Sequence, residues 1–94
     1  MSRTYLKETH SLTENEINLL QAIRNNENLG DNRHEYADEA TWLEETTTWV
    51  ECVCEPFGPS AGGIVASLVK KGFVHTDGET LGFTRAGANL AWAL

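Results

Sequence analysis

One stretch of this chain constrains its fold more than any other: a helical pattern that ends abruptly and passes directly into a β-hairpin pattern. Residues 60–71 predict a helix, because their apolar residues recur at helical spacing. Lys70 and Lys71 fall in its expected last turn, and Gly72 follows as a residue that readily adopts the left-handed conformation of a helix end. A helix that ends directly before two strands predicts an α+β fold with an antiparallel sheet.

The hairpin pattern spans residues 73–84 and centres on Asp77-Gly78. An Asp-Gly pair between two β-prone runs favours a two-residue loop, because a type I′ turn needs positive φ at both central positions. A loop of this length would place Val74 opposite Leu81, with both side chains on one face of the hairpin.

Capping patterns predict two further helices. Thr13 and Glu16 have the spacing of a capping box, in which each side chain accepts a hydrogen bond from the backbone amide of the other, and they predict a helix over residues 14–25. Thr84 can cap a last helix over residues 85–93. Both helices begin at a residue whose side chain can satisfy an otherwise free amide.

The remaining segments are less regular. Residues 26–45 form a long acidic connection, which could be a short helix or an irregular loop, and residues 46–48 are expected to cap a second helix that ends at Pro56. Residues 1–11 are polar and show no clear period. We therefore divide the chain into a polar N-terminal arm, residues 1–11, and one domain, residues 12–94.

Charge is distributed unevenly along the 94 residues. The net charge is −7, and residues 1–55 carry twelve acidic and four basic residues, whereas residues 56–94 carry two acidic and three basic residues. A field of that sign repels a phosphate backbone. No apolar run approaches the roughly 18 residues needed to span a bilayer, and the first residues lack the apolar region of a signal peptide. We expect a cytoplasmic protein with no membrane partner.

Neither a metal site nor an enzyme is predicted. One residue separates Cys52 from Cys54, and this spacing does not suit a structural zinc site. We expect two reduced cysteines that pack as small hydrophobes. Redox or metal chemistry is the alternative. Gly62 and Gly63 lack the spacing and the lysine of a phosphate-binding loop. No nucleophile, base and orienting residue form a recognisable set, so we expect no enzymatic activity and no cofactor.

The aromatic residues are expected to serve packing. Trp49, Phe57, Phe73 and Phe83 fall where the helices and the hairpin should meet. Trp92 lies on the last helix, where it could dock on a second copy of the chain and form a homodimer.

Two runs carry a resemblance to a known family: Gly62 to Val74, with the sequence GGIVASLVKKGFV, and Phe83 to Gly87, with the sequence FTRAG. They resemble MarR-like winged-helix proteins, in which such runs end the recognition helix and close the wing. Small proteins of phage and prophage genomes are similar. The resemblance implies a single winged helix-turn-helix domain with three helices, a two-stranded β-hairpin wing and a C-terminal helix. The acidic connection is longer than the family needs.

The resemblance also implies double-stranded DNA as the partner and transcriptional regulation as the function. In such proteins the third helix, here residues 60–71, enters the major groove, while the wing, here residues 73–84, reaches the backbone or the minor groove. The candidate DNA-binding residues are Ser60, Gly62, Gly63, Ala66, Ser67, Lys70, Lys71, His75 and Arg85.

The alternative is a module for protein–protein interaction. The exposed face expected for residues 60–71 has few of the Arg, Lys, Asn or Gln side chains that read base edges. Asp77 and Glu79 at the wing tip oppose contact with phosphate. In this second hypothesis the acidic residues 27–55 bind a basic partner or another regulator, and both hypotheses stay open.

Overall fold

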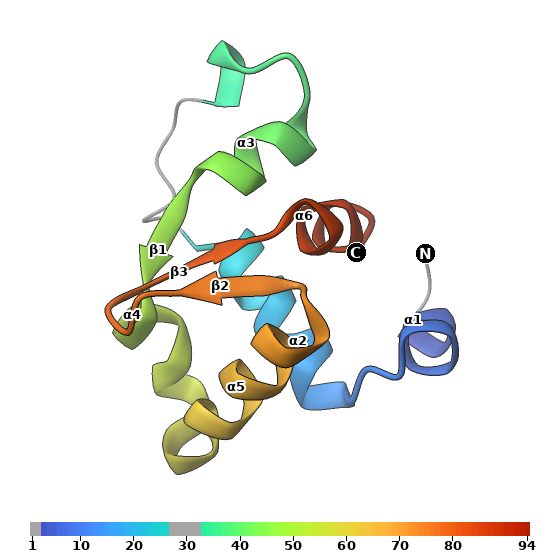
Figure 1. Cartoon of the computed structure of the whole chain (residues 1–94), viewed down its shortest axis with the longest axis vertical. Coiled ribbons are helices and arrows are strands. Elements are labelled where there is room, and N and C mark those ends of the chain that lie inside the picture. Colours follow the sequence, from blue (N-terminus) through green and yellow to red (C-terminus); the bar gives the residue numbers. More distant parts are fainter. Residues whose placement is uncertain (1–2, 27–32) are drawn as a thin grey trace.

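A computed structural model describes residues 3–26 and 33–94 of the chain, and these residues form an α+β fold, as expected (Figure 1). In chain order the elements are α1 (Arg3–His10), α2 (Glu14–Arg24), the 3-10 helix η2 (Arg33–Glu35), α3 (Glu39–Glu45), β1 (Thr47–Trp49), α4 (Val50–Cys54), the 3-10 stretch η3 (Glu55–Ser60), α5 (Ala61–Lys71), β2 (Val74–Thr76), β3 (Thr80–Phe83) and α6 (Arg85–Trp92). The radius of gyration is 12.3 Å, so this part of the chain is compact.

The β2–β3 hairpin lies where the sequence predicts it, but its predicted register is wrong. Val74 lies opposite Phe83 rather than Leu81. The Asp77 side chain accepts hydrogen bonds from two backbone amides further along the loop, each at 2.9 Å, and this arrangement closes a longer loop. Among the described non-glycine residues only Ser11 has a positive φ, so Asp77 does not form the type I′ turn that the two-residue loop requires.

The sheet has a third strand that we did not expect. Thr47–Trp49 form β1 instead of capping a helix, and β1 pairs with β3 in the antiparallel order β1-β3-β2. Threonine and tryptophan favour extended backbone, and here the exposed edge of β3 gives their amides and carbonyls partners. Thr48 is buried against the core opposite Leu81, and helix α4 begins directly after the strand.

The segment that we described as a polar arm contains helix α1, which packs on the rest of the domain. Leu6 is fully buried in the common core. The ring of His10 meets that of Phe73 edge to face, with the centroids 5.9 Å apart. In Figure 1, α1 lies on the side of the molecule opposite the hairpin tip.

The described part of the acidic connection includes a short helix. Asp38 caps α3 by accepting a hydrogen bond from the Thr41 amide at 2.8 Å, and Trp42 and Leu43 are buried in the core. The helical alternative is therefore correct for Glu39–Glu45, whereas residues 27–32 lie outside the described residues.

The FTRAG run has a clear structural role. The Thr84 hydroxyl caps α6 by accepting a hydrogen bond from the Gly87 amide at 3.1 Å, as predicted. A Cβ atom on Gly87 would lie 1.7 Å from the carbonyl oxygen of Phe73, so only glycine allows α6 to approach the start of the hairpin this closely.

The stretch Val50–Lys71 is long and apolar enough to cross a membrane by length and mean hydropathy alone (1.3), contrary to our expectation. It is not one regular helix, because Gly58 has φ 57° and ψ −140° and separates α4 from α5. Only 22 % of its most apolar part is buried. The fold therefore leaves apolar side chains of this stretch at the surface.

Candidate functional site

Helix α5 is held at both ends by its own sequence. It spans Ala61–Lys71, close to the predicted range, and ends where Gly72 adopts φ 84° and its amide bonds to the last turn. Ser60 does not cap it with its side chain, because Ser60 itself has helical backbone angles and continues from η3. Ile64 and Leu68 pack in the core.

One side of α5 is tied to α2 through a buried carboxylate. The Glu16 side chain, which is 3 % exposed, accepts hydrogen bonds from the Lys71 ammonium at 2.7 Å and from the Ser67 hydroxyl at 2.9 Å. The predicted capping box is also present, with the Thr13 amide 2.8 Å from the same carboxylate. Burial alone raises the pKa of a carboxyl group, but these hydrogen bonds outweigh it and hold the pKa of Glu16 below its usual value.

Contacts within the chain engage three of the nine candidate DNA-binding residues, two of them at Glu16 and one at α3. Ser67 and Lys71 bind Glu16, and Lys71 also donates to the Ser11 carbonyl at 2.7 Å. Arg85 lies at the start of α6 and donates to Glu44 and Thr41 of α3, at 3.3 and 3.0 Å. The positive charges of Lys71 and Arg85 are therefore largely compensated within the chain.

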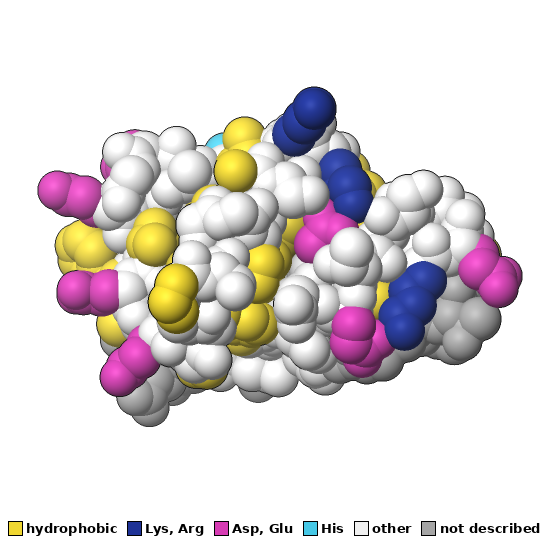
Figure 2. All heavy atoms as spheres, turned by 90° about the horizontal axis from the view of Figure 1, so that it is seen from below, with side chains coloured by type: hydrophobic (Ala, Val, Ile, Leu, Met, Phe, Trp, Pro, Cys, Tyr) yellow, Lys and Arg dark blue, Asp and Glu magenta, His cyan; other side chains and the backbone are white. Residues whose placement is uncertain are grey.

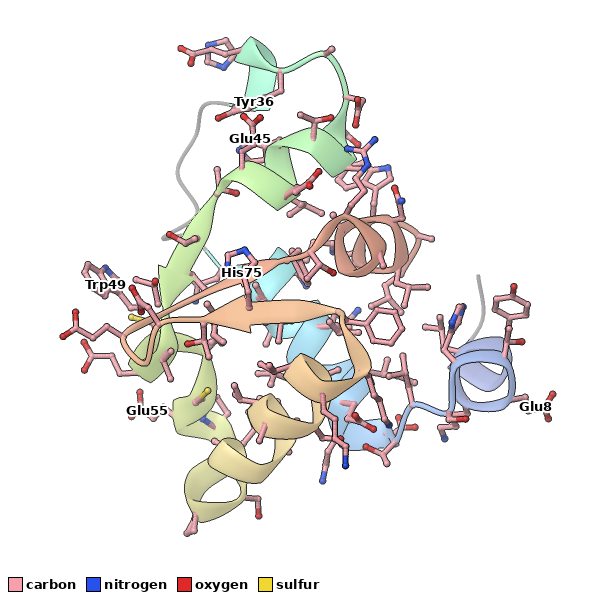
Figure 3. All side chains as sticks on the ribbon, viewed as in Figure 1. Glu8, Tyr36, Glu45, Trp49, Glu55 and His75 are labelled. Atoms are coloured by element: carbon pink, nitrogen blue, oxygen red, sulfur yellow. The ribbon has the colours of Figure 1, made fainter. Side chains whose placement is uncertain are left out.

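The other six candidates are exposed but do not form one basic surface. Lys70 projects from α5 and makes no ion pair with any described residue. Ser60, Gly62, Gly63 and Ala66 are exposed and uncharged. His75 lies on the outward face of the sheet, where its ring covers Gly82, so a Cβ atom there would come within 2.7 Å of the ring (Figure 3).

A groove of about 460 Å³ runs between α4, the outer side of α5 and the hairpin, and we call it the α4–α5 groove. Its lining is mostly apolar and includes Val50, Cys54, Val65, Ala66, Val69 and Thr76. Val69 is 40 % exposed, although it lies next to the fully buried Leu68. Figure 2 shows this face, with apolar side chains gathered on it, acidic side chains at one end and Lys or Arg side chains toward the other.

A second hollow of about 390 Å³ adjoins this groove, and we call it the acidic hollow. It is lined by Trp49, Glu51 and Glu79, and it shares Val50 and Gly78 with the α4–α5 groove. Figure 3 shows Trp49 pointing outward beside the hairpin tip.

The position of Trp49 contradicts its predicted role in packing, since its side chain is 51 % exposed. In β1 the side chains alternate, so the burial of Thr48 directs Trp49 to the outer face of the sheet. The signal that could have revealed this is the alternation in Thr47-Thr48-Trp49, once the segment is recognised as a strand. Phe83 is buried as expected, and Phe57 and Phe73 are partly buried against the core.

The two cysteines have different surroundings. Cys54 is buried in the wall of the α4–α5 groove, and burial raises the pKa of its thiol, so it packs as a small hydrophobe as expected. Cys52 is a free, exposed thiol, which differs from the expectation that both would be packed. Within residues 3–26 and 33–94 no group of three His, Cys, Asp or Glu side chains is placed to hold a metal ion.

No protein-family model, curated protein or solved structure matches this chain. The function is therefore inferred from the surfaces of α5 and from the two hollows beside it.

Proposed function

We propose that this chain is a winged-helix module that binds another protein through the α4–α5 groove. The observation that carries the proposal is the apolar lining of the groove on the outer side of α5. An apolar groove on the surface of a small protein is a candidate contact site for a partner.

The order of the elements supports the winged-helix part of the proposal. After α1, helix α2 corresponds to the first helix of such a domain, and η2 and α3 lie between it and strand β1. Helices α4 and α5 then correspond to the helix-turn-helix pair, and β2 and β3 correspond to the wing. In a DNA-binding member of this class the helix in the position of α5 enters the major groove. The α4–α5 groove thus occupies part of the surface that would otherwise face DNA.

The chemistry of that surface favours protein over DNA. Direct readout of bases relies on polar side chains with paired donors and acceptors, whereas the groove exposes Ala66 and Val69 beside the partly buried Val65. Phosphate binding relies on free cations, and both Lys71 and Arg85 are engaged by carboxylates of the chain itself. The net charge of −7 adds long-range repulsion.

Double-stranded DNA is the second candidate partner, and Lys70 favours it. This side chain is exposed and unpaired among the described residues, and the exposed Gly62, Gly63 and Ala66 would allow close approach to a duplex. Under either proposal the chain acts in the cytoplasm. A homodimer contact is also part of both proposals, because Trp92 is half exposed and could contact a second copy.

The test compares a groove variant with a matched variant elsewhere. Val69→Glu places a charge in the groove at an exposed helical position, and Ala86→Glu makes the same kind of change on the exposed side of α6. Each form is immobilised and incubated with nuclease-treated lysate of the organism that encodes the chain, and circular dichroism checks its fold. We expect a protein that wild type and Ala86→Glu retain and that Val69→Glu loses.

The same three proteins and a fourth, Lys70→Ala, are titrated with a labelled duplex of mixed sequence at about 50 and 200 mM salt. Binding that weakens steeply with salt, is lost in Lys70→Ala and survives in Val69→Glu would overturn the protein-binding proposal in favour of DNA. Retention of the same lysate proteins by all three forms would also contradict it, because the groove would then play no part.

A further inference from the structure

The α4–α5 groove and the acidic hollow lie next to each other, because Val50 and Gly78 line both. We propose that the partner presents a linear segment with bulky apolar side chains next to a lysine or arginine. The apolar side chains fill the groove, and the cation lies against Trp49 between Glu51 and Glu79. This inference rests on the proposed function and specifies the partner's chemistry.

The apolar part of the segment follows from the lining of the groove. Val65 and Val69 stand one helical turn apart on α5, and Val50 and Cys54 stand one turn apart on α4. Side chains that insert between these two pairs displace water from apolar surface, which is favourable in proportion to the area covered. Polar or small side chains would leave that surface uncovered.

The cationic part follows from the charges at one end of the groove. No described residue forms an ion pair with Glu51, Glu55 or Glu79, and all three side chains are exposed. The indole of Trp49 lies in the same hollow as Glu51 and Glu79. An ammonium or guanidinium group over an indole face is attracted by the ring, and the two carboxylates strengthen that attraction.

Charge complementarity favours this segment over three other occupants: a second copy of the chain, a phosphate backbone and a neutral apolar molecule. A second copy of the chain would bring another net charge of −7 to this end, so self-association through it is opposed. A phosphate backbone is repelled by the same carboxylates. A neutral apolar molecule would fill the groove but would gain nothing from Trp49, Glu51 or Glu79.

The experiment uses a displayed library of random linear peptides as the probe. The library is selected on the wild-type chain and depleted on Val69→Glu, so that peptides bound outside the groove are removed. We expect enriched sequences to combine two or more bulky apolar residues with an adjacent lysine or arginine. Enrichment of acidic or neutral sequences, or no enrichment over the depleted pool, would overturn the inference.

A consensus peptide then tests the position of the cation. Its affinity is measured by fluorescence anisotropy on wild type, on Ala86→Glu and on the double variant Glu51→Gln with Glu79→Gln. We expect the double variant to bind about tenfold more weakly and with less dependence on salt, and Ala86→Glu to bind as wild type does. Equal affinity for the double variant and wild type would show that the cation does not lie in the acidic hollow.

Failure of this inference is distinguishable from failure of the proposed function. If the library selects apolar sequences without a cation while Val69→Glu still abolishes capture from lysate, the groove binds protein and only the partner's charge is wrong. If the lysate proteins are retained by Val69→Glu, the proposed function itself is wrong.

Discussion

Two sides of α5 use their side chains in opposite ways. Toward α2 the helix directs Ser67 and Lys71 into a polar cluster around the buried Glu16. Toward α4 and the hairpin it exposes Val69, beside the partly buried Val65, in an open groove. A third side of α5, with Ile64 and Leu68, packs in the core as the apolar stripe of a surface helix normally does, whereas the side of such a helix that faces solvent is normally polar.

This difference indicates what each side contributes. The polar side holds α5 in place, since a buried carboxylate with three kinds of donor specifies one geometry for α2 and α5. On the groove side, Val65 is partly buried against the core, whereas Val69 is 40 % exposed and so adds little to the stability of the free chain. Under the proposed function, a partner would cover this exposed apolar surface.

The sharpest test of this difference uses two adjacent residues. Leu68 is fully buried and Val69 is 40 % exposed. We expect Leu68→Ala to lower the free energy of unfolding by about 2–5 kcal/mol, because it leaves a cavity in the core. Val69→Ala should change it by no more than about 0.5 kcal/mol. Urea denaturation measures both, and similar losses would show that the outer side of α5 is part of the core.

A smaller loss of stability is expected when the polar contacts between α5 and α2 are removed. Glu16→Ala removes the acceptor of Lys71 and Ser67 as well as half of the capping box. We expect a loss of about 2 kcal/mol in the free energy of unfolding, which is typical of hydrogen bonds to charged groups.

The matched control lies on the same turn of α2. Glu14 pairs with Lys7 at 2.6 Å, but both side chains are about half exposed. Because exposed ion pairs contribute little, Glu14→Ala should cost about 0.5 kcal/mol or less. A cost for Glu16→Ala no larger than that for Glu14→Ala would refute the anchoring role of the buried cluster.

The pH dependence of stability gives a third, still smaller effect. Glu16 has a lower pKa in the folded chain than its usual 4.5, so the unfolded chain takes up this proton first as the pH falls. The stability that Glu16 contributes is complete above pH 4.5 and is lost as the pH falls through the pKa of the folded state. We expect the difference in unfolding free energy between wild type and Glu16→Gln to narrow from pH 7 to about pH 3. A constant difference would contradict the lowered pKa.

Local signals explain what could be predicted of the fold. The capping box at Thr13 correctly marks the start of α2, and Gly72 correctly marks the end of α5. The position of the hairpin and the cap at Thr84 follow from equally short patterns. Each of these signals depends on residues within one turn of the backbone.

The features that the sequence did not predict depend on contacts between residues that are distant in the chain. Strand β1 forms because β3, more than 30 residues further along, offers an edge to Thr47–Trp49. The hydrogen bonds from Ser67 and Lys71 to Glu16 span 51 and 55 residues, so both side chains resemble free DNA-binding groups when only the sequence is considered. The exposure of Trp49, and with it the acidic hollow, follows only once β1 is known.

Only a small effect on stability is expected at Trp49, although it is the largest side chain of the sheet. Phe83 lies on the inner face at 1 % exposure, whereas Trp49 lies on the outer face at 51 %. Trp49→Thr keeps a residue that favours strands, so it should change the free energy of unfolding by about 1 kcal/mol or less. The same variant should bind the consensus peptide more weakly, as measured by anisotropy, because its lysine or arginine loses the indole. A large loss of stability with unchanged peptide binding would make Trp49 a structural residue and would remove the aromatic part of the proposed cation site.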